Sequence, residues 1–220
     1  MLTCIEDILS GEDLETIDSL LHDATFEDGK RTAGFRAKRV KENLQLKKSD
    51  NTSPCQALIR DALMKSRKFK QVAFPRLVHP VLISKYDADM QYGAHVDDAI
   101  MSSGHRSDIA VTVFLSDPDT YVGGELYIGI GFGEVAVKLP RGAAVVYSAS
   151  TIHRVAPVLK GERLAAVTWV ESHIRAPERR ELLADLQAVR DHLHSIDPDG
   201  EHTELGFKTY ANLLRMWAQT

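Results

Sequence analysis

The sequence predicts a mainly β protein with helices at both ends of the chain, an α+β arrangement. Two observations support this class. From about residue 76 to 175, short runs rich in β-branched residues alternate with Gly, Pro and Asp turns, which is typical of a sandwich or barrel. On either side of that region, apolar residues recur at helical spacing. A chain of 220 residues fits one such domain with flanking helices.

Residues 1–75 are expected to be a helical flank. Ser10 to Asp13 reads as a capping box, and the following residues place an apolar stripe on one helical face. A second helix is predicted to start at Ser53-Pro54, because Pro is favoured at the first helical position. Each stripe covers one face only, so both helices should pack on the outside of a sheet.

Residues 76–175 are expected to form the β core, as two facing antiparallel sheets. The runs that predict strands are Leu77 to Tyr86, Ile109 to Leu115, Glu125 to Ile128, Glu134 to Leu139, Ala143 to Tyr147 and Arg163 to Ser172.

Residues 176–220 are expected to be a helical appendage. Helical spacing returns after Ala176-Pro177, and Asp197 to Gly200 predicts a turn between two helices. A segment this small buries too little apolar surface to fold without the core.

Composition narrows the classes of function. The net charge of −4 argues against a nucleic-acid partner, which requires a basic surplus. Two cysteines are too few for a disulfide scaffold, and no apolar run approaches the roughly 20 residues of a membrane span. The N-terminus lacks a basic-then-apolar signal pattern. We therefore expect a cytoplasmic protein without a membrane partner.

Three residues predict a metal centre. His95 and Asp97 are two apart, so in an extended segment their side chains share a face. A distant strand can supply His153 as the third ligand. Two His and one carboxylate form the facial triad of non-haem Fe(II) oxygenases, which leaves open positions on the metal.

Arg163 predicts an anion site next to that centre. It begins the apolar run Leu164 to Val170, so the strand carries its charge toward a pocket or its rim. A guanidinium binds a carboxylate through two parallel hydrogen bonds, and a dicarboxylic co-substrate can provide that carboxylate.

These residues, together with longer motifs, resemble the Fe(II)- and 2-oxoglutarate-dependent dioxygenases, and among them the bacterial PKHD-type hydroxylases. The motifs that carry the resemblance are Tyr92 to Ala99, Phe114 to Pro118, Gly123 to Leu126 and Pro140 to Gly142. The group is similar to prolyl 4-hydroxylases and is often associated with iron uptake.

The resemblance implies a double-stranded β-helix (jelly-roll) core and hydroxylation of a small-molecule or peptidyl substrate. Fe(II), 2-oxoglutarate, O₂ and L-ascorbate would take part, and succinate and CO₂ would be released. Arg163 would bind the distal carboxylate of 2-oxoglutarate, with Tyr86 and Thr112 as further co-substrate contacts. Ala165 departs from the Arg-x-Ser pattern of many relatives, so another group must share that carboxylate.

Two alternatives remain open at this point. A non-redox, cupin-like metal-binding module can use the same triad but does not need Arg163. A zinc hydrolase is disfavoured because the sequence lacks H-E-x-x-H.

The segment 30–48 is locally basic, which reverses the overall charge. It is either a solvated loop or a lid that recruits an anionic substrate. Its basic residues are Lys30, Arg31, Arg36, Lys38, Arg39, Lys41, Lys47 and Lys48.

Overall fold

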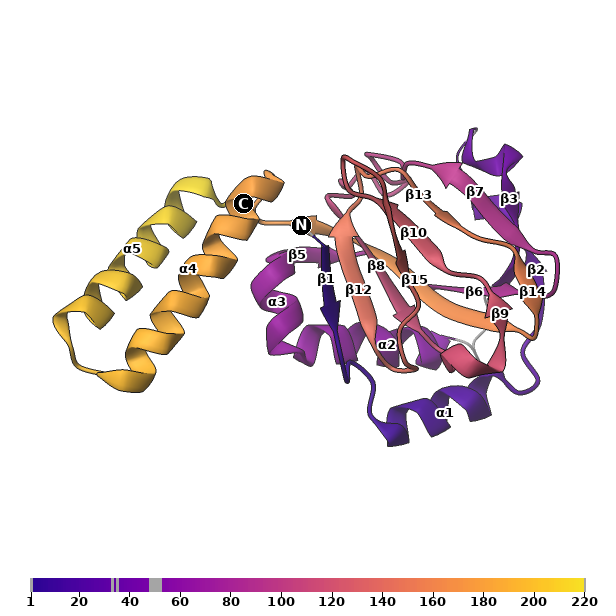
Figure 1. Ribbon diagram of the computed structural model, residues 1–220, viewed down its shortest axis with the longest axis horizontal. Coiled ribbons are helices and arrows are strands. Elements are labelled where there is room, and N and C mark those ends of the chain that lie inside the picture. The colour runs from indigo at the N-terminus through magenta and orange to yellow at the C-terminus, as the bar shows by residue number, and fades with distance from the viewer. Residues whose placement is uncertain (1, 33, 35, 48–52, 220) are drawn as a thin grey trace.

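The core of the molecule is a pair of facing antiparallel sheets (Figure 1). The computed structural model describes residues 2–32, 34, 36–47 and 53–219. The larger sheet also contains β5 (Pro75–Val78), which pairs with one end of its longest strand. The strands of the larger sheet, in sheet order, are β1 (Leu2–Ile5), β12 (Ala144–Ser148), β8 (Ile109–Phe114), β15 (Arg163–Ser172), β6 (Leu82–Tyr86), β4 (Leu44–Leu46) and β2 (Phe26–Asp28).

The smaller sheet covers one face of the larger sheet. A separate two-stranded sheet consists of β14 (Val158–Lys160) and β9 (Val122–Gly123). The short helix η3 (Pro118–Thr120) lies just before β9 in the chain. In sheet order, the strands of the smaller sheet are β11 (Glu134–Val137), β10 (Leu126–Gly129), β13 (His153–Val155), β7 (Gln91–His95) and β3 (Lys41–Glu42). This arrangement confirms the predicted jelly-roll core.

Side chains of β8 alternate between the two faces of the larger sheet. Val111 and Val113 belong to the apolar cluster on the outer face, whereas Ala110 and Phe114 belong to the cluster between the sheets. Because strand residues two apart share a face, Thr112 points toward the space between the sheets. The core therefore has two layers, and only the inner layer borders the site described below.

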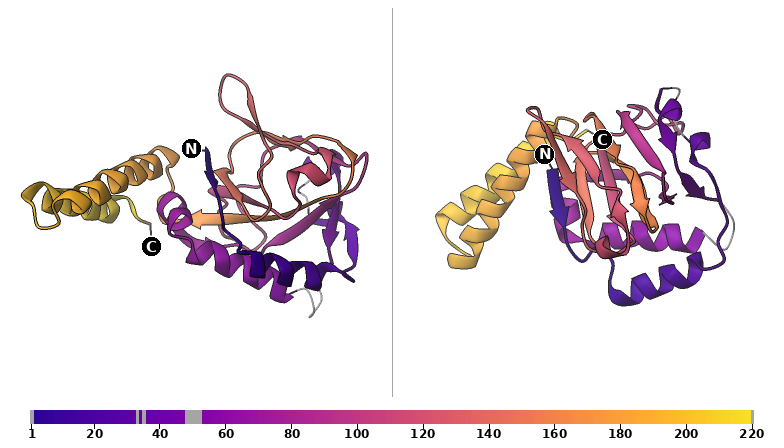
Figure 2. Two further views of the ribbon diagram at one scale, coloured as in Figure 1. Left: turned by 60° about the horizontal axis from the view of Figure 1, so that its bottom comes forward. Right: turned by 45° about the vertical axis from the view of Figure 1, so that its right-hand side comes forward.

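Three helices cover the outer face of the larger sheet (Figure 2). They are α1 (Gly11–Leu21), α2 (Ser53–Lys65) and α3 (Arg67–Ala73). The capping box at the start of α1 is present, since Ser10 and Asp13 bind each other's backbone N–H groups. The expected helices and their packing on one sheet are confirmed, and α3 is an additional helix that the sequence pattern does not predict.

The N-terminal segment is more than a helical flank, because β1, β3 and β4 pair with strands of the core and β2 extends the larger sheet by pairing with β4. This corrects the expectation of helices alone in residues 1–75. These strands are two to four residues long, too short to show a period of two. The same segment forms two short helices, η1 (Gly29–Thr32) and η2 (Ala37–Arg39), where a loop or lid was considered.

The C-terminal helices form a hairpin that projects from the sheets (Figures 1 and 2). The hairpin consists of α4 (Pro177–Ile196) and α5 (Glu201–Trp217), joined by the predicted turn. A small apolar cluster built on Phe74, Ile174 and Leu183 attaches it to the core. The division of the chain at residues 75 and 175 stays a prediction. Among the described residues, no helix is long and apolar enough to span a membrane.

Candidate active site

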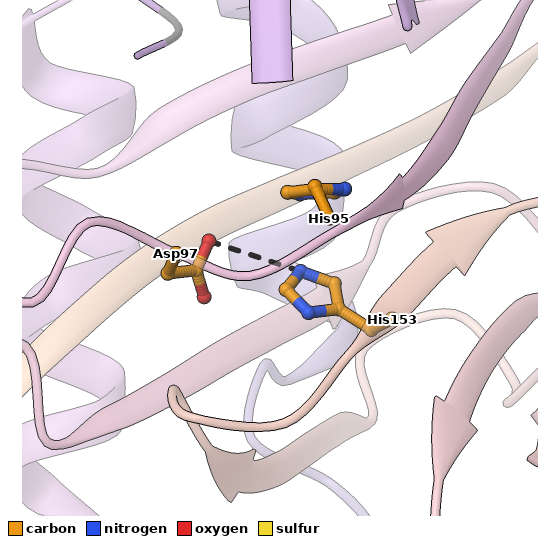
Figure 3. A group of neighbouring side chains, drawn as sticks. All are labelled: His95, Asp97 and His153. Atoms are coloured by element: carbon orange, nitrogen blue, oxygen red, sulfur yellow. Dashed lines mark ion pairs between the residues drawn. The ribbon is translucent and has the colours of Figure 1, made fainter. Parts of the chain in front are cut away.

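Three side chains converge at one end of the smaller sheet (Figure 3). His95 is the last residue of β7 and His153 the first of β13, and the two are directly opposite in the ladder. Asp97 lies two residues beyond β7. Its Oδ1 is 3.8 Å from His153 Nε2, and potential ligand atoms of all three residues lie within 4.8 Å of one another. The structure thus brings together the three residues that the sequence predicts.

Both imidazoles are held in the form that metal binding requires. His95 Nδ1 lies 2.8 Å from the Gly93 carbonyl oxygen, and His153 Nδ1 lies 2.9 Å from that of Thr151. A carbonyl only accepts, so each Nδ1 carries the proton and donates it. Each Nε2 is then left as the lone-pair nitrogen for a metal ion.

The protonation of the triad also suits a cation. Burial, followed by the neighbouring His153, lowers the pKa of His95 to about 3, so this ring is neutral at pH 7. Burial raises the pKa of Asp97, while His153 and Trp169 oppose that rise. Asp97 Oδ2 is buried and has no hydrogen-bond partner among the described residues. A divalent cation would satisfy this oxygen and stabilise the carboxylate form.

Tyr92 supports the metal-binding end of β7. Its ring stacks on the His95 imidazole with centroids 3.7 Å apart. On the neighbouring edge, Gly93 lets β7 approach the chain closely, because an added Cβ would lie 2.8 Å from Val40 Cβ. The ring and the glycine together fix the position of His95.

Arg163 begins β15 and extends between the sheets. Its side chain is buried, with a relative exposure of 2%, and its guanidinium lies over the rings of Tyr86 and Phe114. Arg163 Nε has no hydrogen-bond partner, and no acidic side chain in the described ranges forms an ion pair with the group. A buried guanidinium without a counter-charge is costly. The site therefore favours an incoming carboxylate.

Gly124 gives Arg163 its space. Gly124 has a φ of +67° and the adjacent Gly123 a φ of +78°, both in the left-handed region that favours glycine. A Cβ at Gly124 would lie 3.0 Å from Arg163 Cδ. The glycine pair is thus a close-approach feature that shapes the anion site.

One cavity joins all six predicted site residues. Its volume is about 580 Å³, large enough for both a co-substrate and part of a substrate. Tyr86 is paired with Arg163 in the ladder between β6 and β15, and burial raises the pKa of its hydroxyl while Arg163 opposes that rise. The predicted residues on the cavity wall are Tyr86, His95, Asp97, Thr112, His153 and Arg163.

Several polar residues of this cavity are not marked as site residues by any pattern in the sequence. Lys41 and Gln45 come from the two-residue and three-residue strands β3 and β4, and both are buried. The basic composition of the segment was visible, but a solvated loop is the wrong description for Lys41. Lys48 lies outside the described residues. The sequence pattern places Trp169 only in an apolar strand, whereas in the structure it lines the cavity.

The donor set fits Fe(II). Two neutral imidazole nitrogens and one carboxylate on one side of a cavity leave coordination positions open toward that cavity. Arg163, buried in the same cavity, suits one carboxylate of a dicarboxylic acid whose other end reaches the metal. No described acidic or cysteine side chain joins the three ligands as a fourth.

Comparisons with known proteins agree with this geometry. Residues 81–171 match the family model of the 2OG-Fe(II) oxygenase superfamily. The chain is 48% identical over 223 residues to a PKHD-type hydroxylase of Synechococcus sp. (strain JA-2-3B'a(2-13)), with 100% of both chains covered. It is 42% identical over 219 residues to a PKHD-type hydroxylase of Maricaulis maris, again with 100% of both covered.

Solved structures share the fold at low sequence identity. A prolyl-4-hydroxylase of Pseudomonas putida matches with a TM-score of 0.52 and 14% identity, over 78% of this chain and 92% of that one. A prolyl hydroxylase of Trichoplax adhaerens, in complex with a peptide fragment, matches with a TM-score of 0.56 and 13% identity, over 83% and 86%. The solved structures show the fold alone, whereas the sequence relatives show the family. On their evidence the chain belongs to the PKHD-type hydroxylases of the 2OG-Fe(II) oxygenase superfamily.

Proposed function

We propose that His95, Asp97 and His153 bind Fe(II) and that Arg163 binds the distal carboxylate of 2-oxoglutarate. The enzyme is a 2-oxoglutarate-dependent dioxygenase that hydroxylates a C–H bond and releases succinate and CO₂. The observation that carries this proposal is the buried Arg163, which lacks an acidic partner and lines the same cavity as three metal-ligand side chains. A metal-binding module without this reaction has no use for such a group.

The protein's own residues position the reactants. The bound iron supplies the redox chemistry with O₂. The carbonyls of Gly93 and Thr151 hold the imidazoles in one tautomer. Arg163 orients 2-oxoglutarate by a paired, charge-assisted contact at the far end of the cavity. Tyr86 and Thr112 are the neighbouring hydroxyl groups that we assign to the same co-substrate, in the place of the hydroxyl that Ala165 lacks.

The substrate class follows only in part. The Trichoplax adhaerens relative in fold was solved with a peptide fragment, while another, with a TM-score of 0.56, is an alpha ketoglutarate dependent carbocyclase from nogalamycin biosynthesis. Both peptidyl and small-molecule substrates therefore suit this fold. Ascorbate dependence, a link to iron uptake and a cytoplasmic location stay predictions.

The direct test measures succinate formed from 2-oxoglutarate, with Fe(II), ascorbate and O₂, against a pool of peptides and metabolites. The same samples are assayed for bound iron. We expect O₂-dependent succinate from the unaltered protein and none from His95→Ala. Protein that retains iron but never forms succinate would favour the non-redox, cupin-like module instead.

A further inference from the structure

Lys41 is a buried lysine that forms no ion pair with the described acidic side chains. Its relative exposure is 5%, and it lines the cavity that contains the triad. Its Nζ donates one hydrogen bond, 3.1 Å long, to Thr32 Oγ1. Asp28 and Asp97 attract this ammonium, but no acidic side chain in the described part of the chain approaches it closely enough for an ion pair. An ammonium has three N–H donors, so two remain for another partner.

The two neighbours of Lys41 complete a polar wall. The Thr32 hydroxyl accepts from Lys41, since an ammonium only donates, and its own proton is directed to Gln45 Oε1 at 2.5 Å or to the Gly29 carbonyl oxygen at 3.2 Å. Gln45 has a relative exposure of 6%, and the NH₂ end of the same amide is a further donor on the cavity wall. The wall joins β3 of the smaller sheet to β4 of the larger sheet. The Lys41 ammonium and the Gln45 NH₂ group are donors on one wall, and such donors suit an anion.

Lys41 belongs to the metal-binding end of the cavity. It is opposite Tyr92 in the ladder, and its Nζ lies 5.1 Å from the centre of the Tyr92 ring. That ring also stacks on His95. Arg163 instead lies over Tyr86 and Phe114. The two cations thus contact different rings, and each can serve a different carboxylate.

We propose that Lys41, with Thr32 and Gln45, forms a subsite for a carboxylate of the primary substrate. This inference rests on the proposed function, in which Arg163 already binds the distal carboxylate of 2-oxoglutarate. Arg31 also lines the cavity, but Glu27 neutralises it through a 2.7 Å ion pair. Of the two described cations that this segment places on the cavity wall, Lys41 is the one without an ion pair. The substrate class is an acid whose reacting carbon lies a short distance from its carboxylate.

The test uses Mn(II) in place of iron, so that no turnover occurs, with 2-oxoglutarate bound. The probes are N-acetylglycine, N-acetylalanine and N-acetylphenylalanine, each compared with its carboxamide. Relaxation of the probe protons by Mn(II) reports binding close to the triad. The variants are Lys41→Met and Lys41→Gln, of which the second keeps a donor for Thr32. Lys38→Met, an exposed lysine outside the cavity wall, is the matched control.

We expect the unaltered protein and Lys38→Met to bind at least one acid about tenfold more tightly than its amide. The preference should fall below about twofold in both Lys41 variants, while their affinity for 2-oxoglutarate stays unchanged. Equal binding of acids and amides by the unaltered protein would overturn the inference. A tenfold loss of 2-oxoglutarate affinity in the Lys41 variants would also overturn it, since Lys41 would then serve the co-substrate. Failure of the unaltered protein to bind 2-oxoglutarate at all would instead contradict the proposed function. In that case the acid and amide probes are compared on the Mn(II) protein without 2-oxoglutarate, which still tests the Lys41 subsite.

Discussion

His153 lies directly opposite His95 in the antiparallel ladder between β13 and β7, and their ring centroids are 4.3 Å apart. The two strands are held by backbone hydrogen bonds, so the spacing of these ligands is set by the sheet itself. Asp97 is the third ligand and comes from the segment after β7. The sheet therefore fixes two ligands, and the loop supplies one.

Removing one strand ligand should remove the metal. We expect His95→Ala and His153→Ala to lose stoichiometric Fe(II) and all succinate formation, because the remaining pair cannot hold a labile divalent ion. Metal content after anaerobic reconstitution and desalting measures the effect. His192→Ala, which changes an exposed histidine on α4, should bind iron normally. Full iron binding by His95→Ala would place the metal elsewhere.

Removing the buried guanidinium should weaken the binding of 2-oxoglutarate and leave the binding of the metal unchanged. Arg163→Ala should raise the Kd for 2-oxoglutarate by an amount equivalent to about 2–5 kcal/mol, part of which reflects the unpaired carboxylate left behind. Arg163→Lys should restore binding only partly, because a point charge lacks the planar fork. Anaerobic titration of the Fe(II) protein, followed by its charge-transfer absorption, measures the affinity. Unchanged affinity in Arg163→Ala would assign the diacid to Tyr86 and Thr112 instead.

The sequence predicts much of the site because its chemistry is local. The spacing of His95 and Asp97 is readable from two positions, and Arg163 is an obvious charge at the start of an apolar strand. The long strands and the helices with apolar stripes are also readable, since each repeats its pattern several times. Such elements include α1, α4 and β15.

The features that the sequence could not predict depend on strand pairing between distant parts of the chain. Strands β3 and β4 have two and three residues, and they are extended only because β7 and β6 pair with them. Lys41 and Gln45 are buried as a result of that pairing, and nothing in a basic, loop-like segment marks them as cavity residues. The register of β3 against β7, which places Lys41 opposite Tyr92, is likewise a property of the whole sheet.

Glu171 should stabilise one wall of the cavity. Its buried carboxylate binds Arg76 and Arg106, and accepts a hydrogen bond from His105. These contacts attach the loop that contains Met101, which lines the cavity, to β15. Glu171→Gln leaves Arg76 without its counter-charge and leaves Arg106 with Asp108 alone. We therefore expect a loss of about 1–3 kcal/mol in unfolding free energy at pH 7. Urea unfolding measures it.

The same carboxylate should show a defined pH dependence. Burial raises the pKa of Glu171, but the His105 hydrogen bond and the charges of Arg106 and Arg76 outweigh burial and lower it. A lowered pKa in the folded state gives stability that is complete above the unfolded value, near 4.5, and is lost as the pH falls through the folded value. The difference between the unaltered protein and Glu171→Gln should therefore shrink below pH 4.5. Glu162→Gln, at an exposed pair with Lys85, should change stability by less than about 1 kcal/mol at any pH.

The C-terminal hairpin should be dispensable for ligand binding. No residue of α4 or α5 lines the cavity, and the hairpin attaches through the cluster of Phe74, Ile174 and Leu183. A chain ending at residue 175 should bind Mn(II) and 2-oxoglutarate with affinities within about threefold of the whole protein, at lower thermal stability. The isolated segment 176–220 should show no cooperative unfolding, because it buries too little apolar surface. A cooperative transition in that segment would contradict the predicted appendage.

Replacing Lys41 should stabilise the ligand-free protein. Burial lowers the pKa of Lys41 from 10.5 to about 8, although Asp28 and Asp97 oppose the shift, and the facing Tyr92 ring and Thr32 hydroxyl do not prevent it. The ammonium therefore destabilises the folded state relative to the unfolded chain, by at most about 3 kcal/mol. Lys41→Met, which keeps the length of the side chain without its charge, should raise the unfolding free energy at pH 7 by about 1–3 kcal/mol.

The pH dependence of that gain tests its cause. Between pH 8 and 10.5 the unfolded chain still binds the Lys41 proton while the folded protein has released it, so the stability of the unaltered protein rises relative to Lys41→Met. The advantage of the variant should be complete below about pH 8 and should disappear as the pH approaches 10.5. Lys38→Met, which removes an exposed charge from the same segment, should show no such trend. Paired urea unfolding curves at pH 7, 8.5 and 10 measure the difference. A variant that is less stable than the unaltered protein at pH 7 would mean that Lys41 already has a counter-charge in the folded state, and the cavity would then have no unneutralised cation at its metal-binding end.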